Sequence, residues 1–223
     1  MIQGRPFFQL QWIVDNLDEI GRRLGEHVLM TLIAISVGFA ISFGLALLVR
    51  GRPRLYGPVI GIAGTIYSIP SLALFALLIP LTGISLLTAE IALVGYTLLI
   101  LVRNIVTALD GVSPEVIQAA DGMGYTPRQR LWRVELPIAL PVIVAGLRIA
   151  TVTTIGLVAV TTLIGMGGLG YLIINTGIRR FFATSIYTGV ILSVGLAVFA
   201  DLGLLAAQRR LTPWARAREG RDA

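Results

Sequence analysis

Long apolar stretches alternate with short polar segments along almost the whole chain. A helix of about 20 apolar residues is long enough to cross the hydrocarbon core of a bilayer. The pattern therefore predicts an all-α, polytopic membrane protein with about five transmembrane helices. The apolar stretches are residues 28–49, 57–80, 86–109, 138–163 and 183–206.

The first 27 residues have a different pattern from the spans. Trp12, Ile13, Leu17, Ile20 and Leu24 recur near helical spacing, with acids and arginines between them. This favours an amphipathic helix lying on the membrane surface. A helix packed on a partner outside the membrane is the alternative. If residues 1–27 or residues 164–180 dip into the bilayer, the chain has a sixth span.

The second apolar stretch contains a proline, Pro70, within Ser68-Ile69-Pro70-Ser71. A proline inside a span frees a backbone carbonyl and bends the helix. We expect a kinked helix over residues 57–80, with Pro70 available for a role in a gate or pathway.

Composition agrees with a membrane protein and excludes several kinds of chemistry. The chain of 223 residues is 56% hydrophobic and 13% charged, against about 25% charged in soluble domains. It has no cysteine and one histidine, His27. Disulfides, thiolate catalysis and a histidine-based metal cluster are therefore excluded.

All 18 basic residues are arginine. A Walker A phosphate loop needs a lysine, so a partner would have to hydrolyse ATP if ATP drives this protein. The arginines stand at the ends of the spans, which indicates membrane topology and no nucleic-acid partner. With the N-terminus outside, twelve arginines lie on the inner side and five on the outer side. The positive-inside rule favours this orientation, with a basic cytoplasmic tail at 207–223.

Residues 113–137 form the most polar segment between two spans. Ser113 is suited to cap a helix over about 114–122, and Gly122 and Gly124 suit a left-handed helix end. Thr126 then caps a second helix, on which Arg128, Arg130 and Arg133 stay in water or meet a partner. The pattern predicts a helix–glycine–helix elbow outside the bilayer, joined to the span at 138–163.

The elbow resembles the EAA loop of ABC importer permeases. The matching pattern is Gln118-Ala119-Ala120, Gly124 and Leu136-Pro137 at the family spacing. The resemblance implies a type I ABC importer fold whose cytoplasmic coupling helix docks into a groove of the ATPase subunit. Gln118 departs from the usual glutamate, which removes a charge there. An ordinary polar loop is the alternative. The implied ATPase-coupling residues are Gln118, Ala119, Ala120, Asp121, Gly124, Tyr125, Arg128, Leu136 and Pro137.

A second glycine-rich segment, Gly165-Met166-Gly167-Gly168-Leu169-Gly170, matches the dinucleotide fingerprint literally. That fingerprint needs a strand–turn–helix unit and an acid about 20 residues later, and both are missing from the pattern here. Glycines allow close backbone approach, and irregular backbone at membrane depth must be buried in protein or line a cavity. We expect Gly165, Gly167, Gly168 and Gly170 to form an outer gate; a plain extracellular turn is the alternative.

Charged residues inside spans are functional candidates. Arg148 and Asp201 lie at similar depths and are expected to pair. We prefer a structural pair that locks two helices over a role in the pathway. Glu90 stands at the outer end of its span, where an interfacial position is expected and contact with a substrate cation is the alternative.

The segments Ser68–Leu74, Val134–Pro137 and Ile164–Gly170 resemble the permeases of osmoprotectant importers. That resemblance implies transport of glycine betaine, choline or carnitine across a prokaryotic inner membrane. It implies as partners an ABC ATPase subunit, a second permease subunit, identical or different, and an extracytoplasmic binding protein. ATP and Mg are bound by the ATPase, and this chain holds no cofactor or metal and is not an enzyme. The alternatives are a permease for another small solute such as methionine, and a stand-alone secondary transporter or channel.

Overall fold

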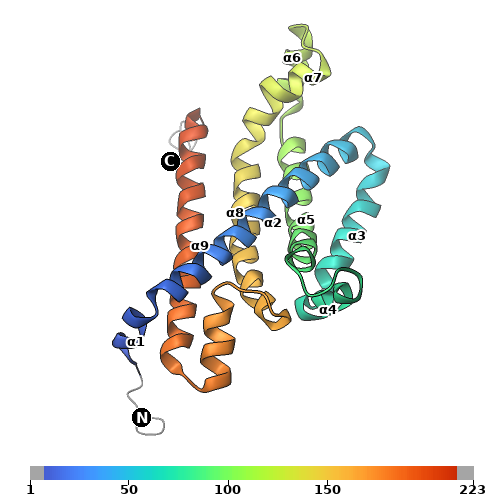
Figure 1. Ribbon diagram of the computed structural model, residues 1–223. Coiled ribbons are helices and arrows are strands. Elements are labelled where there is room, and N and C mark those ends of the chain that lie inside the picture. Colours follow the sequence, from blue (N-terminus) through green and yellow to red (C-terminus); the bar gives the residue numbers. More distant parts are fainter. Residues whose placement is uncertain (1–7, 215–223) are drawn as a thin grey trace.

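The computed structural model describes residues 8–214, and all regular structure in that part is helical (Figure 1). The helices longer than one turn are α1 (Leu10–Asp15), α2 (Leu17–Gly51), α3 (Tyr56–Ser68), α4 (Ser71–Thr82), α5 (Leu86–Asp110), α6 (Pro114–Gly122), α8 (Leu136–Val160) and α9 (Ala183–Leu211). The remaining helical pieces, each of three to six residues, are η1 (Pro53–Leu55), α7 (Pro127–Arg130), η2 (Leu131–Glu135), η3 (Thr161–Ile164), η4 (Leu172–Gly177) and η5 (Ile178–Arg180).

Helix α2 starts earlier than the sequence pattern predicts. It runs unbroken from Leu17 to Gly51 over 35 residues, which is about 52 Å at 1.5 Å per residue. No helix end falls between residues 27 and 28, where the sequence pattern placed the start of the first span, because Leu17–His27 is the beginning of the first long helix. Within residues 8–27, α1 alone forms a separate short helix. The expected basic tail lies largely outside the described residues, as do residues 1–7.

The second predicted span is broken where a kink was expected. Helices α3 and α4 meet at an angle of 100° around Ile69 and Pro70. Ile69 is extended, with φ −71° and ψ 129°, as expected for a residue before proline. The Tyr96 hydroxyl of α5 donates a hydrogen bond to the Ile69 carbonyl. A neighbouring helix thus satisfies the backbone at the break, which is how broken helices are tolerated at membrane depth.

Helix α5 is the centre of the fold. It packs against α2, α8 and the broken pair α3–α4. Leu101 and Ile105 join Val49 and Ile143 in the core at one end. At the other end, Leu93 joins a core of Met30, Phe75 and Val158, among others.

Four helical stretches within residues 8–214 are long and apolar enough to cross a membrane, and α3–α4 makes a fifth if the bent pair counts as one span. The elbow α6–α7 projects from one end of the molecule, and the glycine segment lies at the other end (Figure 1). Residues 164–180 are more than the polar turn expected from sequence. They include the π-helical turn η4 and the 3-10 turn η5, which lead back into α9.

Candidate functional site

The elbow has the helix–glycine–helix form expected from its sequence. Helix α6 begins at Pro114 and ends at Gly122, and Gly124 follows with a positive φ of 81°. The Tyr125 amide donates to the Ala120 carbonyl at 3.2 Å, which closes the helix end. Gly124 therefore supplies the left-handed turn, as predicted, while Gly122 remains helical, contrary to expectation.

The second half of the elbow is fixed by a capping box. The Thr126 hydroxyl accepts from the Gln129 amide, and the Gln129 side chain accepts from the Thr126 amide at 2.9 Å. Such reciprocal bonds satisfy two amides that a helix start leaves free. Ser113, by contrast, makes no side-chain cap at the start of α6.

The residues of the loop motif divide into two groups. Gln118, Ala119, Asp121, Gly124 and Arg128 are exposed on the surface of the elbow. The others face inward to different degrees: Ala120 is buried, and Tyr125, Leu136 and Pro137 are half-buried. The exposed group offers a surface to a partner, while the inward group anchors that surface to the rest of the chain.

An ion-pair cluster connects the elbow to two long helices. Arg130 donates through Nη1 to both carboxylate oxygens of Asp121, at 2.6 and 2.7 Å, and through Nε to Glu135 at 2.8 Å. Arg50, in the last turn of α2, donates to the second oxygen of Glu135. Arg130 was expected to stay in water or meet a partner, so its internal pairing is a correction. The cluster links α6, α7, η2 and α2 through charged side chains.

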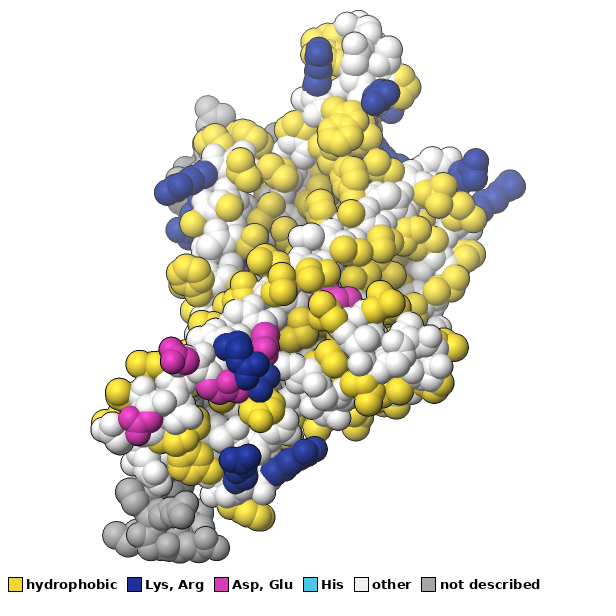
Figure 2. Space-filling view, viewed as in Figure 1, with side chains coloured by type: hydrophobic (Ala, Val, Ile, Leu, Met, Phe, Trp, Pro, Cys, Tyr) yellow, Lys and Arg dark blue, Asp and Glu magenta, His cyan; other side chains and the backbone are white. Residues whose placement is uncertain are grey.

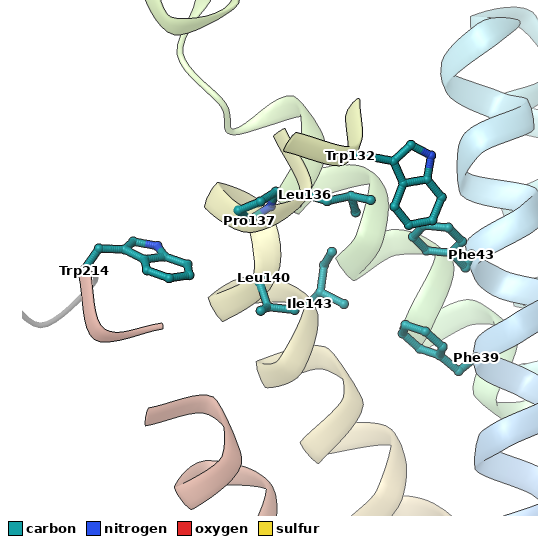
Figure 3. Close-up of a pocket in the computed structure, with 8 residues that line it drawn as sticks. All are labelled: Phe39, Phe43, Trp132, Leu136, Pro137, Leu140, Ile143 and Trp214. Carbon is teal, nitrogen blue, oxygen red and sulfur yellow. The ribbon is translucent and has the colours of Figure 1, made fainter. Parts of the chain in front are cut away.

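An apolar groove of about 490 Å³ lies beside this cluster. Figure 3 shows Trp132 pointing toward Phe43 of α2, with Trp214 on the far side of α8. The rings of Phe43 and Trp132 have centroids 6.1 Å apart. Tryptophan is enriched at the membrane–water interface, so these side chains mark the depth at which the elbow leaves the bilayer.

The glycine segment is attached to α2 by three contacts. Glu26 accepts from the Gly168 amide at 2.9 Å, and the Arg23 guanidinium lies 3.6 Å from the centroid of the Tyr171 ring. His27 accepts from the Leu169 amide through Nδ1 at 3.2 Å. Its Nε2 therefore carries the proton and donates to the Ile155 carbonyl of α8 at 3.0 Å. This buried histidine joins α2, α8 and the glycine segment.

A side chain at two glycines of this segment would meet very close neighbours, a flexible side chain at Gly167 and fixed backbone at Gly170. A Cβ at Gly167 would lie 1.8 Å from the Glu26 carboxylate, and one at Gly170 would lie 1.9 Å from the Ala159 carbonyl. Gly165 and Gly168 have positive φ values of 84° and 81°. Gly165 and Gly168 are thus required for left-handed backbone and Gly170 for close contact with backbone, whereas at Gly167 the Glu26 side chain would have to move.

The intramembrane charges fall into two environments. Arg148 and Asp201 form two parallel hydrogen bonds of 2.8 Å between α8 and α9, so the structure brings this predicted pair together. Glu90 was expected at the interface, but only 8% of its surface is exposed. Neither of its carboxylate oxygens has a hydrogen-bond partner among residues 8–214.

Figure 2 shows arginines at the elbow and at the neighbouring ends of α2 and α9, with apolar side chains over much of the surface between the two ends. The opposite end carries the acids and arginines of the α2 N-terminus, where Glu19 and Glu26 pair with Arg22 and Arg23. Charge is thus concentrated at both ends of an apolar body.

The chain matches a known family of transport proteins over most of its length. Residues 36–213 match the family described as "Binding-protein-dependent transport system inner membrane component". The chain belongs to this family. It is therefore a membrane-embedded, non-catalytic permease subunit of an ABC transport system.

Curated relatives of the permease extend over nearly its whole length. It is 35% identical to the choline transport system permease protein OpuBB of Bacillus subtilis, over 92% of this chain and 94% of that one. It is 40% identical to the osmoprotectant import permease protein OsmW of Salmonella typhimurium, over 92% and 97% respectively.

A solved structure has the same fold as the permease. A chain of the MetNI methionine ABC transporter, in inward-facing conformations, superposes with a TM-score of 0.80 at 28% identity, covering 89% of this chain and 98% of that one. The expected type I importer fold is confirmed by this match.

No role was predicted from the sequence for several residues that hold the elbow, the glycine segment or the break between α3 and α4. Glu135, Arg50, Glu26 and Tyr96 were assigned no role, and His27 was considered only as a metal ligand. The position of Glu135 in the sequence could have indicated an ion pair. It directly precedes Leu136-Pro137 at the start of a span, and an acid that is buried there needs a partner. The other partners are distant in sequence.

Proposed function

We propose that this permease forms the translocation pathway of an ATP-driven importer for quaternary-ammonium osmoprotectants such as glycine betaine, choline or carnitine. The observation that carries the proposal is the match to permeases of choline and osmoprotectant import over nearly the whole of both chains. It is supported by the expected signature segments around Pro70, the elbow and the glycine segment.

The proposed orientation places the N-terminus outside and the C-terminus and elbow in the cytoplasm. The arginine distribution supports it, because cytoplasmic segments carry the excess of positive charge. Arg50 lies in the last turn of α2 and Arg52 and Arg54 follow it, while Arg209 and Arg210 lie in the last turn of α9. These helix ends are at the same end of the molecule as the elbow (Figure 1). The outer end of the molecule would then carry the first turns of α2 and the glycine segment.

The exposed face of the elbow is the proposed contact with the ATPase subunit. Gln118, Ala119 and Gly124 lie on it together with the exposed side chain of Met123, so the face offers both open backbone and an apolar side chain to a groove on the ATPase. ATP and Mg are bound by that partner. When the ATPases close, the elbow is carried with them, and the Arg130–Glu135–Arg50 chain passes the movement to α2 and α8.

Helix α2 carries the movement to the outer end. Its Glu26 and His27 hold the backbone of Gly168 and Leu169, so displacement of α2 or α8 must strain these contacts. We assign Gly165, Gly167, Gly168 and Gly170 to the outer gate on this basis. Pro70, at the break between α3 and α4, belongs to the same half of the pathway.

A second permease subunit, identical or different, completes the pathway in this account. Exposed apolar side chains on α9, such as Val194, Val198 and Phe199, and on the first turns of α5 are available to it or to lipid. A binding protein outside the membrane delivers the substrate.

Reconstitution tests the function. Proteoliposomes containing the permease with its ATPase and binding protein should take up labelled glycine betaine or choline only when ATP is supplied. Uptake of methionine in place of these amines would support the second candidate, which the likeness to the methionine transporter favours. Uptake by the permease with no ATPase would overturn both.

A further inference from the structure

Glu90 is an acidic side chain of the membrane region for which the fold supplies no counter-charge. Only 8% of the surface of Glu90 is exposed, and its two carboxylate oxygens have no hydrogen-bond partner among the described residues. Asp201 of α9, by contrast, is held by two bonds from Arg148. Unpaired carboxylates in a membrane protein are costly and point to a function.

The position of Glu90 on α5 is at the border of two faces. At 100° per residue, it lies about 60° from Leu93 on one side and about 60° from Leu87 on the other. Leu93 is fully buried in the core, while Leu87 is 59% exposed. A change of side-chain rotamer can therefore move the carboxylate from the packed face toward the open one.

Glu90 lies near the level of the glycine segment along α5. It is the fifth residue of α5, about 6 Å along the axis from Leu86. The turn just before α5 contacts the glycine segment, since a Cβ on Gly165 would lie 3.5 Å from the Ile84 side chain. Its helix neighbours Ala89 and Leu93 share a core with Ile164 and Met30.

We propose that Glu90 binds the quaternary ammonium group of the substrate at the outer entrance of the pathway, beside the glycine gate. A trimethylammonium cation cannot donate a conventional hydrogen bond, so a carboxylate recognises it by charge alone. A carboxylate held without an internal partner is free to do this. The inference rests on the proposed function and assigns a binding residue to it.

The experiment uses the reconstituted complex of permease, ATPase and binding protein. Uptake of choline, which carries only a positive charge, and of glycine betaine, which also carries a carboxylate, is measured for wild type, Glu90→Gln and Glu90→Asp. Asp110→Asn is the matched control, because it removes an acid from the exposed end of the same helix.

We expect Glu90→Gln to reduce choline uptake on the order of tenfold or more, as removal of a buried charge partner does. Betaine uptake should fall less, Glu90→Asp should retain part of the choline uptake, and Asp110→Asn should match wild type. Choline uptake by Glu90→Gln within twofold of wild type would overturn the inference. Absence of amine uptake by the wild-type complex would instead overturn the proposed function.

Thermal unfolding separates binding from a structural role. Because the unpaired carboxylate costs stability in the folded state, Glu90→Gln and the apolar Glu90→Met should unfold at the wild-type temperature or above it. If both variants unfold at clearly lower temperatures, the carboxyl group is structural and the inference is wrong.

Discussion

Arg130 and Glu135 lie on opposite sides of the junction between the elbow and α8, and their side chains are joined at 2.8 Å. Only 1% of the Glu135 side chain is exposed. The same carboxylate accepts from Arg50 at the end of α2. A buried acid thus binds one arginine from the elbow and one from a long membrane helix, and we expect a push on the elbow to reach the membrane through this connection.

Replacing Glu135 with glutamine should loosen this junction. Two arginines would lose their shared counter-charge, and we expect the free energy of unfolding to fall by about 1–3 kcal/mol, less than for a fully buried pair because both arginines are partly exposed. Thermal unfolding in detergent measures this. Glu115→Gln, which removes an exposed acid from α6, is the control, and equal unfolding temperatures for the two variants would contradict the assigned role.

Gly124→Ala should impair coupling between ATP hydrolysis and uptake while the protein still inserts into the membrane. The space around Gly124 is open, so the defect comes from its positive φ, which costs an ordinary L-residue about 1–2 kcal/mol. Gly124→Asn should be milder, because asparagine tolerates this conformation. Gly122→Ala is the control, since Gly122 is helical and unobstructed.

The comparison is made by substrate-stimulated ATPase activity of the reconstituted complex. Gly124→Ala should lower the stimulation more than Gly124→Asn does, and Gly122→Ala should leave it unchanged. If stimulation instead falls with side-chain size at both positions, the left-handed turn is not what the loop requires.

Gly170→Ala should destabilise the glycine segment and reduce uptake. Its new Cβ would meet the backbone carbonyl of Ala159, which has no rotamer to move into, and overpacking of this kind costs about 1–3 kcal/mol. The matched control is Gly156→Ala on α8, where the added methyl meets nothing within 4 Å. A Gly170→Ala variant as stable and active as Gly156→Ala would show that the close contact is dispensable.

Exchanging the charges of Arg148 and Asp201 tests whether they lock α8 to α9. Each single reversal should lower the unfolding temperature, and the double variant Arg148→Asp with Asp201→Arg should recover most of the loss. Recovery of stability together with uptake supports the structural role that we prefer. Recovery of stability without uptake would instead assign the pair to the pathway.

The parts of the permease that sequence could predict depend on local chemistry. The turn at Gly124, the cap at Thr126 and the length of the apolar stretches follow from a few adjacent residues, and these expectations are confirmed. The Arg148–Asp201 contact could be predicted because helix rise alone places both charges at one depth.

The remaining features depend on contacts between distant segments. Arg50 and Glu135 are 85 residues apart, and His27 meets a loop 142 residues away, so no local pattern reveals either contact. Pro70 predicted a bend in the second span. The break of 100° between α3 and α4 is also accompanied by a hydrogen bond from the Tyr96 hydroxyl to the Ile69 carbonyl, which the sequence did not indicate. Glu90 looked interfacial because its burial comes from helices that pack around α5.

The central claim is that the elbow is in the cytoplasm, where an ATPase can move it, and cysteine labelling tests it directly. The natural chain has no cysteine, so Arg128→Cys and Asp18→Cys each introduce a single exposed thiol. A membrane-impermeant maleimide should label Asp18→Cys, but not Arg128→Cys, in cells with a permeabilised outer envelope and an intact inner membrane. In inverted vesicles it should label Arg128→Cys, and added ATPase subunit should block that labelling. Labelling of Arg128→Cys from the outside would contradict the account.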